Sequence, residues 1–301
     1  NRPDCLGHVG VAREIAAAFS RALLPRPAPP PEQGAPAAGA VDVAVEAPDL
    51  CPRYTARLVR GVRVGSSPPR VARRLEACGL RSVNNVVDAS NLVLLETGHP
   101  IHTFDFARVG GGAIRVRRAR PGETLVTLDG VPRDLSPGML VIADESRPVA
   151  LAGVIGGASS EIRGSTTEVL VEAAVFEPGS VRSTARRLGL ATDASHRFER
   201  GVDPDGVLAA QDLAVRLLAE LSGGAAAPGL VDVRPRLASP RPVRVRPVRV
   251  RRLLGYDPGV DAMREALVRL GIGVEEAPDG DLLARPPPFR GDLLREADFV
   301  A

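Results

Sequence analysis

Thr184-Ala-Arg-Arg-Leu-Gly-Leu-Ala-Thr-Asp-Ala-Ser-His-Arg-Phe-Glu-Arg-Gly-Val-Asp203 combines hydroxyls, a histidine, acids and arginines and contains almost no apolar run. Burial of apolar side chains cannot order such a segment by itself. Its polar groups must either satisfy one another in a hydrogen-bonded loop or face a ligand. The residues of this stretch leave both possibilities open.

A second polar motif, Val83-Asn-Asn-Val-Val-Asp-Ala-Ser-Asn91, opens a segment whose other residues are largely Val and Leu. Asn84, Asp88 and Asn91 are spaced i, i+4 and i+7, which predicts one polar face on a helix over residues 83–95. From this pattern alone, a solvated outer face is favoured over a binding site.

A third motif, Gly98-His-Pro-Ile-His-Thr-Phe-Asp105, contains His102. A lone histidine is usually structural. In this motif, Gly and Pro make a rigid loop that can present an imidazole to a ligand. His102 is therefore a candidate for a site residue.

Glu172 is the sole charge in Val169-Leu-Val-Glu-Ala-Ala-Val-Phe176, a segment typical of a buried strand. Strand alternation places it on the same face as Leu170 and Ala174. An ionised carboxylate in such a place costs on the order of several kcal/mol unless it is paired or hydrogen-bonded. The two explanations are an ion pair with one of the many arginines and recognition of a polar ligand group.

Taken in their order along the chain, the three polar motifs resemble the tRNA-editing module of the β subunit of bacterial phenylalanine–tRNA ligases. The resemblance implies hydrolysis of the ester bond of tyrosyl-tRNA. A phenylalanine pocket rejects a ring with one extra hydroxyl by only about 100-fold, whereas a pocket built to bond that hydroxyl rejects phenylalanine strongly. A second, hydrolytic pocket therefore supplies the missing discrimination.

The resemblance also assigns individual residues to this pocket. Ser90 and Asn91 match positions near the bound ester. His102, rather than His99, matches the editing histidine, which holds either the terminal adenosine of tRNA or the attacking water. Glu172 matches the residue that accepts a hydrogen bond from the para-hydroxyl of tyrosine.

Small residues complete the predicted pocket. Gly156 and Gly157 would let backbone amides approach the scissile carbonyl. Thr192 and Ala194 match residues that shape the pocket, and the small Ala194 leaves space for the tyrosyl ring. The candidate catalytic residues are thus Ser90, Asn91, His102, Gly156 and Thr192, and the candidate substrate-binding residues are Gly157, Glu172 and Ala194. Four further residues of the first motif are assigned to loop architecture: Ser195, His196, Arg197 and Glu199.

Composition excludes several classes of protein. All 39 basic residues are arginine, which excludes Schiff-base lysines and a P-loop lysine. The three cysteines are far apart in sequence, which argues against disulfides and a zinc site.

The chain has no run of about eighteen apolar residues and no signal peptide, so we expect a cytoplasmic protein without membrane contact. With a net charge of +3, nucleic-acid binding would depend on arginine clusters such as residues 115–120 and 241–252, which taken alone are typical of solvated strand faces.

The chain is predicted to divide into four parts: a helical N-terminal remnant (1–24, helix over 11–23), a poorly packed Pro/Ala linker (25–40), the editing domain (41–233) and a small domain (234–301). The editing domain is predicted to contain a helix with Ser67 as its N-cap and Pro68 in its first turn, a hairpin around Asp129-Gly130, strands over 139–143, 149–155 and 169–175, and a helix capped by Asp203-Pro204. A second linker is predicted over residues 223–240, before the small domain. Strands and helices without regular βαβ alternation predict an α+β fold with a mixed sheet.

The small domain is predicted to contain a strand over 243–250, a helix bearing Met263, Leu267 and Leu270, and a hairpin around Asp279-Gly280. It resembles the winged-helix-like α+β domain that follows the editing module in the same β subunit. We expect this domain to be truncated at its C-terminal end and the chain to be a piece of a longer polypeptide.

The resemblance further implies an acidic magnesium cluster after the small domain. Asp292 and Asp298 match two of its members, but the next position is Ala301, and two carboxylates six residues apart make no site by themselves.

For the complete enzyme, the resemblance implies magnesium, ATP, a ligase α subunit in an α2β2 assembly, and tRNA for phenylalanine as partners. Editing itself is expected to need no cofactor, and this chain alone is not expected to aminoacylate. Two alternatives remain: a free-standing trans-editing hydrolase, and a tRNA-binding scaffold with an inactive pocket.

Overall fold

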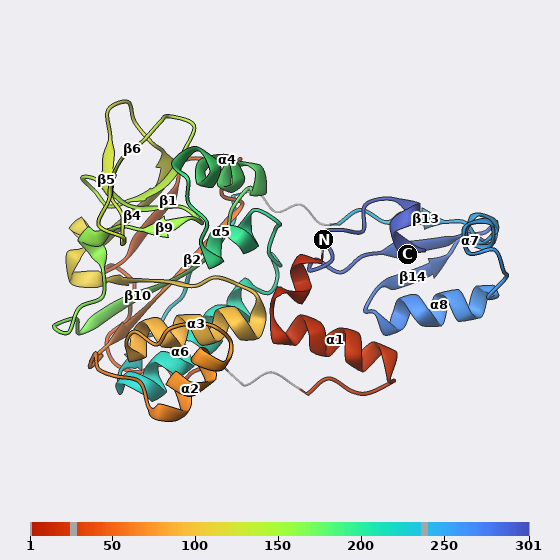
Figure 1. Cartoon of the computed structure of the whole chain (residues 1–301), viewed down its shortest axis with the longest axis horizontal. Helices are drawn as coiled ribbons and strands as arrows, with labels where there is room; N and C mark the ends of the chain where they lie inside the picture. The colour runs from red at the N-terminus through yellow and green to blue at the C-terminus, as the bar shows by residue number, and fades with distance from the viewer. Residues whose placement is uncertain (1, 25–28, 236–239, 301) are drawn as a thin grey trace.

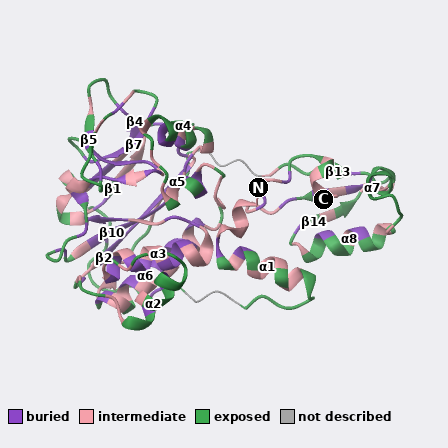
Figure 2. Ribbon diagram, in the orientation of Figure 1, coloured by how far each residue is buried: buried purple, intermediate pink, exposed green. Residues whose placement is uncertain are grey.

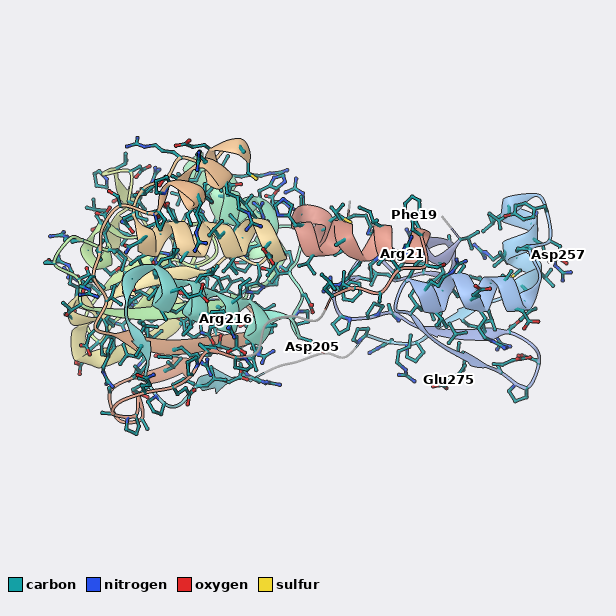
Figure 3. All side chains as sticks on the ribbon, turned by 90° about the horizontal axis from the view of Figure 1, so that it is seen from below. Phe19, Arg21, Asp205, Arg216, Asp257 and Glu275 are labelled. Atoms are coloured by element: carbon teal, nitrogen blue, oxygen red, sulfur yellow. The ribbon has the colours of Figure 1, made fainter. Side chains whose placement is uncertain are left out.

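The computed structural model describes residues 2–24, 29–235 and 240–300. They form a large lobe (residues 29–233) and a small lobe (residues 240–300), with helix α1 (His8–Ala18) lying between them (Figure 1). Seen from below, Phe19 and Arg21 mark the end of α1 that faces the small lobe (Figure 3). Among the described residues, no helix has the length and apolarity needed to cross a bilayer.

Sheet A of the large lobe is antiparallel and has the order β11 (Ala225–Ala226), β2 (Arg53–Arg60), β10 (Glu168–Val175) and β3 (His102–Asp105), with β12 (Val231–Val233) also paired to β2. β2 and β10 are buried over most of their length, which explains the near-continuous apolar run predicted as a strand over 169–175. The register places Glu172 opposite His102 on β3, and Ala174 opposite Tyr54 on β2.

Sheet B has the order β1 (Asp42–Val45), β4 (Ala113–Arg118), β7 (Leu140–Ala143), β8 (Pro148–Leu151) and β9 (Ile155–Gly156). β1 and β4 run parallel and the other neighbours antiparallel, so the predicted mixed-sheet α+β class is confirmed. The two sheets share one hydrophobic core, which includes Leu58 and Leu170 of sheet A and Ile142 of sheet B.

Two local features, a separate two-stranded hairpin and a turn within sheet B, bear on the predictions. The predicted hairpin is confirmed as β5 (Thr124–Val126) and β6 (Pro132–Asp134), with Gly130 at φ 78° in its turn. The single strand predicted over 149–155 is wrong: the segment turns at Gly153, which has φ 70°, and forms β8 and β9. A Cβ at Gly153 would stand 3.0 Å from Phe176 and Val181, so the turn is also closely packed.

Helices α2 (Pro69–Ala77), α3 (Asn85–Thr97) and α6 (Val207–Ser222) lie together beside sheet A (Figure 1). A second core joins Val59 and Val171 of sheet A to Val93 of α3 and Ala214 of α6, so helices cover the face of sheet A that sheet B leaves open. Purple, buried segments therefore occupy the interior of the large lobe in Figure 2.

The predicted caps of two helices are wrong. Ser67 does not cap α2; its hydroxyl donates to Oδ2 of Asp88 at 2.6 Å, and Pro68 precedes the helix. Asp203 does not cap α6, which begins after Gly206. Instead, the Asp203 carboxylate accepts a hydrogen bond from the amide of Asp205.

The polar stretch 184–203 forms helices and a turn rather than an extended loop. It contains the end of α4 (Pro178–Leu188), a turn at Gly189 with φ 65°, and the short helix α5 (Asp193–Phe198). Thr192 and Ser195 form a capping box at the start of α5, each side chain accepting from the backbone amide of the other residue.

The small lobe has a three-stranded sheet in the order β13 (Val243–Val245), β15 (Leu282–Arg285) and β14 (Gly273–Glu276), with α7 (Pro247–Leu254) and α8 (Val260–Arg269). The predicted helix and hairpin are thus observed. The strand predicted over 243–250 is wrong after Val245, because Pro247 lies at the first turn of α7, where its fixed φ and missing N–H favour a helix start.

The two segments predicted as linkers are ordered where they are described. Residues 25–28 and 236–239 lie outside the described residues. Ala37 is buried, and the amide of Gln33 donates to the carbonyl of Ala226. Residues 225–226 and 231–233 are strands of sheet A. Most of residues 29–40 are exposed, as expected of a poorly packed linker, but the amides of Gln33 and Ala37 tie the segment to the carbonyls of Ala226 and Pro228.

The N-terminal helix lies earlier than its predicted range of 11–23, since α1 ends at Ala18 and Ser20 adopts a positive φ of 52°. The remaining elements are single 3-10 turns: Pro3–Leu6, Phe106–Arg108, Gly110–Gly112, Ala158–Ser160 and Glu296–Phe299.

Candidate active site

A pocket of about 220 Å³ opens where β3, β9, β10 and α5 meet. Five of the eight residues predicted for an editing pocket line it: His102, Gly156, Glu172, Thr192 and Ala194. They come from positions up to 92 residues apart in the sequence, and sheet A together with the α4–α5 turn brings them into one site. Its apolar wall includes Ile142, Ala150, Leu151, Phe176 and Phe198.

Glu172 places a buried carboxyl in this wall. The residue is 4% exposed, and its Oε2 accepts a hydrogen bond from the hydroxyl of Tyr54 at 3.1 Å. No arginine in the described part of the chain lies within ion-pair distance of it, so the ion-pair explanation is wrong. Burial raises the pKa of the Glu172 carboxyl to about 8, against the opposing effect of the Tyr54 hydrogen bond. At neutral pH the carboxyl is therefore mostly protonated and uncharged.

His102 faces Glu172 across the sheet, as its cross-strand partner on β3. Its ring meets the ring of Phe104 edge to face, with centroids 4.4 Å apart. Burial of the imidazole lowers its pKa to about 4, so the ring is neutral at pH 7. The site therefore holds two titratable groups that are both uncharged at neutral pH.

Gly156 is required by the position of His102. A Cβ atom on residue 156 would stand 2.5 Å from Cε1 and 2.9 Å from Nε2 of the imidazole. Gly157 has a different role, because its amide donates to the carbonyl of Val149 at 2.8 Å within sheet B. This hydrogen bond occupies the N–H of Gly157, and the use of its amide at the scissile carbonyl stays a prediction. Gly157 does not line the pocket.

Thr192 and Ala194 bring the start of α5 to the pocket. The Thr192 hydroxyl donates to the carbonyl of Val154 at 2.7 Å and accepts from the amide of Ser195 at 3.0 Å. This hydroxyl therefore ties α5 to the turn before β9. Ala194 is half-buried against the core, with its methyl group on the pocket.

The other polar residues of the first motif are architectural, as expected. Ser195 completes the capping box, and Arg197 pairs with Asp193 one turn earlier in α5. Glu199 pairs with Arg200, and His196 is exposed.

Ser90 and Asn91 lie on α3 and are not among the residues that line the pocket. The Ser90 hydroxyl donates to the carbonyl of Val87 within the helix at 2.7 Å.

Asn84 and Asp88, two residues of the polar face predicted on this helix, form hydrogen bonds at the start of α3 and with the segment before it. Asn84 is the N-cap of α3, accepting from two backbone amides, rather than a residue of the helical face. Asp88 is fully buried and accepts from the hydroxyls of Ser67 and Ser82 and from the amide of Val83. The prediction of a solvated face is therefore wrong at Asp88.

Tyr54 is a site residue that the sequence does not reveal. It lies in Arg53-Tyr-Thr-Ala-Arg57 of β2, and it is fully buried behind Glu172. A single tyrosine in a strand carries no signal by itself, because its partner Glu172 is 118 residues away in the sequence.

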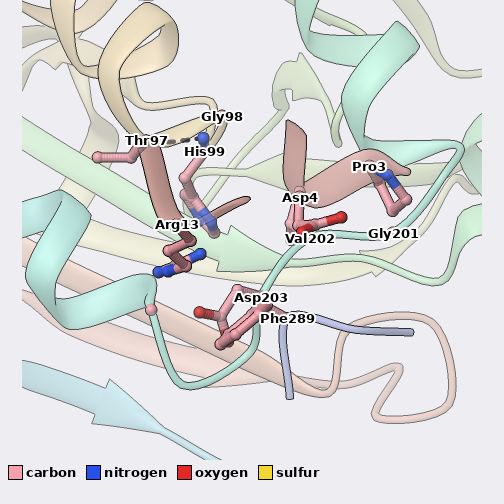
Figure 4. A pocket seen from close by; sticks show the side chains of 11 residues that line it. Pro3, Asp4, Arg13, Thr97, Gly98, His99, Gly201, Val202, Asp203 and Phe289 are labelled. Carbon is pink, nitrogen blue, oxygen red and sulfur yellow. Dashed lines mark hydrogen bonds between the residues drawn. The ribbon is translucent and has the colours of Figure 1, made fainter. Parts of the chain in front are cut away.

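A second cavity, of about 30 Å³, lies at the junction of the N-terminal segment, the loop after α3 and the small lobe (Figure 4). His99 lines it and is 4% exposed, with no hydrogen-bond partner for Nε2 among the described residues. Burial lowers the pKa of His99 to about 4. The guanidinium of Arg13 stacks over the ring of Phe289 at 4.2 Å, which joins α1 to the small lobe.

Asp292 and Asp298 are not brought together with further ligands. Asp292 accepts two hydrogen bonds from Arg290, and Asp298 accepts from the amides of Leu294 and Arg295. Within the described ranges, no group of three or more His, Cys, Asp or Glu side chains has the arrangement of a metal site.

The arginine cluster in β4 is largely neutralised. Arg115 pairs with Asp42, and Arg118 pairs with Asp49. Arg117 is buried and pairs with Glu123. This cluster is therefore no free cationic surface for nucleic acid.

Comparison with known proteins supports the predicted resemblance. Residues 50–223 match the B3/4 domain family, and residues 243–301 match the tRNA synthetase B5 domain. The chain is 50% identical over its whole length to the phenylalanine–tRNA ligase β subunit of Anaeromyxobacter dehalogenans, and 48% identical to that of Moorella thermoacetica. It spans 38% and 37% of the length of these two relatives. A solved N-terminal fragment of the phenylalanyl-tRNA synthetase β subunit from Pyrococcus horikoshii is 18% identical, with a TM-score of 0.45 over all of this chain and 82% of the fragment.

Proposed function

Because this chain belongs to the B3/4 domain family and is similar to phenylalanine–tRNA ligase β subunits along its whole length, we propose that its pocket edits mischarged tRNA. The substrate is tyrosyl-tRNA, and the reaction is hydrolysis of the ester that joins tyrosine to the terminal ribose. The observation that carries this proposal is the buried carboxyl of Glu172 in an otherwise apolar pocket wall, without a cation beside it in the described chain.

Glu172 supplies the discrimination between tyrosine and phenylalanine. The para-hydroxyl of a tyrosyl ring finds a hydrogen-bond partner at the carboxyl, whereas a phenylalanyl ring leaves the oxygen that Tyr54 does not bind without a partner. The apolar wall, with Phe176 and Phe198, accepts the ring itself. The small side chain of Ala194 keeps the space for the ring open.

His102 acts by orienting the ester end of the substrate. A general base works best when its pKa lies near the operating pH. The lowered pKa of His102, about 4, makes it a weak base at neutral pH, which favours a hydrogen bond to the terminal adenosine or to water over full proton abstraction. Gly156 leaves the space that this ring occupies.

The partners, cofactors and location that we propose rest on sequence similarity to the ligase β subunits. They are a ligase α subunit, tRNA for phenylalanine, a cytoplasmic location, and ATP and magnesium in the complete ligase. Asp292 and Asp298 do not fit a magnesium site with the other described residues, since arginine and backbone amides already use their carboxylates. The proposed hydrolysis uses no step at these residues.

The experiment that tests the function is deacylation of tyrosyl-tRNA and phenylalanyl-tRNA by the 301-residue chain. We expect rapid hydrolysis of the first ester and little of the second. Binding of tRNA without hydrolysis of either ester would instead establish a scaffold with an inactive pocket. Equal hydrolysis of both esters would remove the role proposed for Glu172.

A further inference from the structure

Tyr54 is the buried hydrogen-bond partner of Glu172. It lies on β2 opposite Ala174 of β10, two residues from Glu172 on the same face of the sheet. Diagonal neighbours of this kind lie within reach of an aromatic side chain. The hydroxyl of Tyr54 donates a hydrogen bond to Oε2 of Glu172 at 3.1 Å, and Tyr54 is 0% exposed.

No other hydrogen bond holds the Glu172 carboxyl among the described residues. The nearby thiol of Cys51 donates instead to the carbonyl of Arg53. His102 faces Glu172 from β3 with a neutral ring. A carboxyl held at one point by a rigid partner keeps one orientation, whereas a carboxyl without that partner can turn about its last side-chain bond.

We propose that Tyr54 is a positioning residue for substrate selection, which binds Oε2 of Glu172 and so leaves Oε1 as the oxygen that meets the tyrosyl hydroxyl. This inference rests on the proposed editing function and names the residue through which Glu172 acquires its selectivity. Tyr54 itself does not line the pocket, so it acts on the substrate only through Glu172.

The test is the ratio of kcat/KM for tyrosyl-tRNA to kcat/KM for phenylalanyl-tRNA, measured for the chain, Tyr54→Phe and Tyr256→Phe. Tyr256 is the other tyrosine of the chain and is exposed in the small lobe, so it is a matched control. We expect the ratio to fall about tenfold in Tyr54→Phe, equivalent to about 1.4 kcal/mol, and to stay unchanged in Tyr256→Phe. An unchanged ratio in Tyr54→Phe, with a selective parent, overturns this inference alone. A parent without selectivity overturns the proposed function as well.

A double-mutant cycle separates positioning from general structural support. In the Glu172→Ala background, we expect Tyr54→Phe to change the ratio no further, because the group on which Tyr54 acts is gone. A further loss of selectivity in that background shows that Tyr54 acts by another route and contradicts the inference.

The pH dependence of the selectivity ratio is a further test, because a purely structural role of Tyr54 would leave its midpoint unchanged. The groups that face Glu172 are Tyr54 and Cys51 from the β2 side and His102 from β3. The Tyr54 hydrogen bond lowers the pKa of Glu172, so Tyr54→Phe should move the pH midpoint of selectivity upward. Replacing Tyr54 with 3-fluorotyrosine, a more acidic donor of nearly the same shape, should move the midpoint downward. This second variant decides the question if Tyr54→Phe does not fold, and a midpoint that stays fixed contradicts the inference.

Discussion

The imidazole of His102 lies so close to Gly156 that a Cβ atom at residue 156 would stand 2.5 Å from Cε1 of the ring. His102 comes from sheet A and Gly156 from sheet B, so the two sheets are in close contact at the pocket. Leu128, from the end of the β5–β6 hairpin, limits the remaining space, with Cδ1 3.0 Å from the same Cβ position.

We predict that Gly156→Ala displaces His102 and lowers tyrosyl-tRNA hydrolysis by roughly 10- to 100-fold, since a misplacement of about 1 Å in a site can cost that much. Kinetic measurement with tyrosyl-tRNA checks this. Gly164→Ala is the matched control, because nothing lies within 4 Å of a Cβ at Gly164. Equal activity of both variants would show that the ring of His102 has no fixed role.

We predict that Ala194→Trp abolishes hydrolysis without unfolding the large lobe, because the indole fills the pocket rather than a closed core. Deacylation assays and a thermal melt check this, with Ala191→Trp as the control at an exposed position of the same turn. A large fall in melting temperature for Ala194→Trp alone would show overpacking of the interior instead.

The stability of the fold should depend on the protonation of Glu172. Its pKa is raised from 4.5 to about 8 in the folded chain, so the folded state binds the proton more tightly than the unfolded state. The free energy of unfolding should therefore fall as pH rises from about 4.5 to 8, by at most about 1.4 kcal/mol per pH unit from this group.

Chemical denaturation at several pH values checks this prediction. Glu172→Gln should remove that part of the slope, whereas Glu161→Gln, at an exposed position, should leave it in place. The same slope in the parent and in Glu172→Gln would mean that Glu172 does not bind its proton more tightly in the folded state.

The sequence predicts the pocket better than it predicts the helix caps. Glu172 is recognisable because a single charge in an apolar strand needs a special reason, and the α+β class follows from the order of strands and helices. The role of Asp88 is not predictable in this way. Its spacing from Asn84 and Asn91 is that of an exposed face, but Ser67 and Ser82, from outside the helix, enclose its carboxylate.

Pairing between strands that are far apart in the sequence explains other differences between the predicted and the observed structure. Residues 225–226 and 231–233 have a linker composition, yet β2 supplies them with backbone partners, which no local pattern reveals. Tyr54 likewise acquires its role only when β2 pairs with β10. Pro247 is the opposite case, because a local rule, proline at the first turn of a helix, decides against the strand that the alternation of Val and Arg predicts.

The most direct test of the account compares tyrosyl-tRNA selectivity in the parent, Glu172→Gln and Glu172→Ala. Glutamine keeps a neutral amide oxygen in place of the carboxyl, whereas alanine removes the hydrogen-bonding group entirely. We predict selectivity in the order parent, Gln, Ala, without a large stability loss shared by both variants, because no arginine depends on Glu172 among the described residues. Alanine should cost about 1–3 kcal/mol more than glutamine, since it leaves the buried Tyr54 hydroxyl without its partner. A shared stability loss of roughly 3–5 kcal/mol in both variants, as expected for a stranded buried cation, or undiminished selectivity in Glu172→Ala, would contradict recognition of the tyrosyl hydroxyl by Glu172.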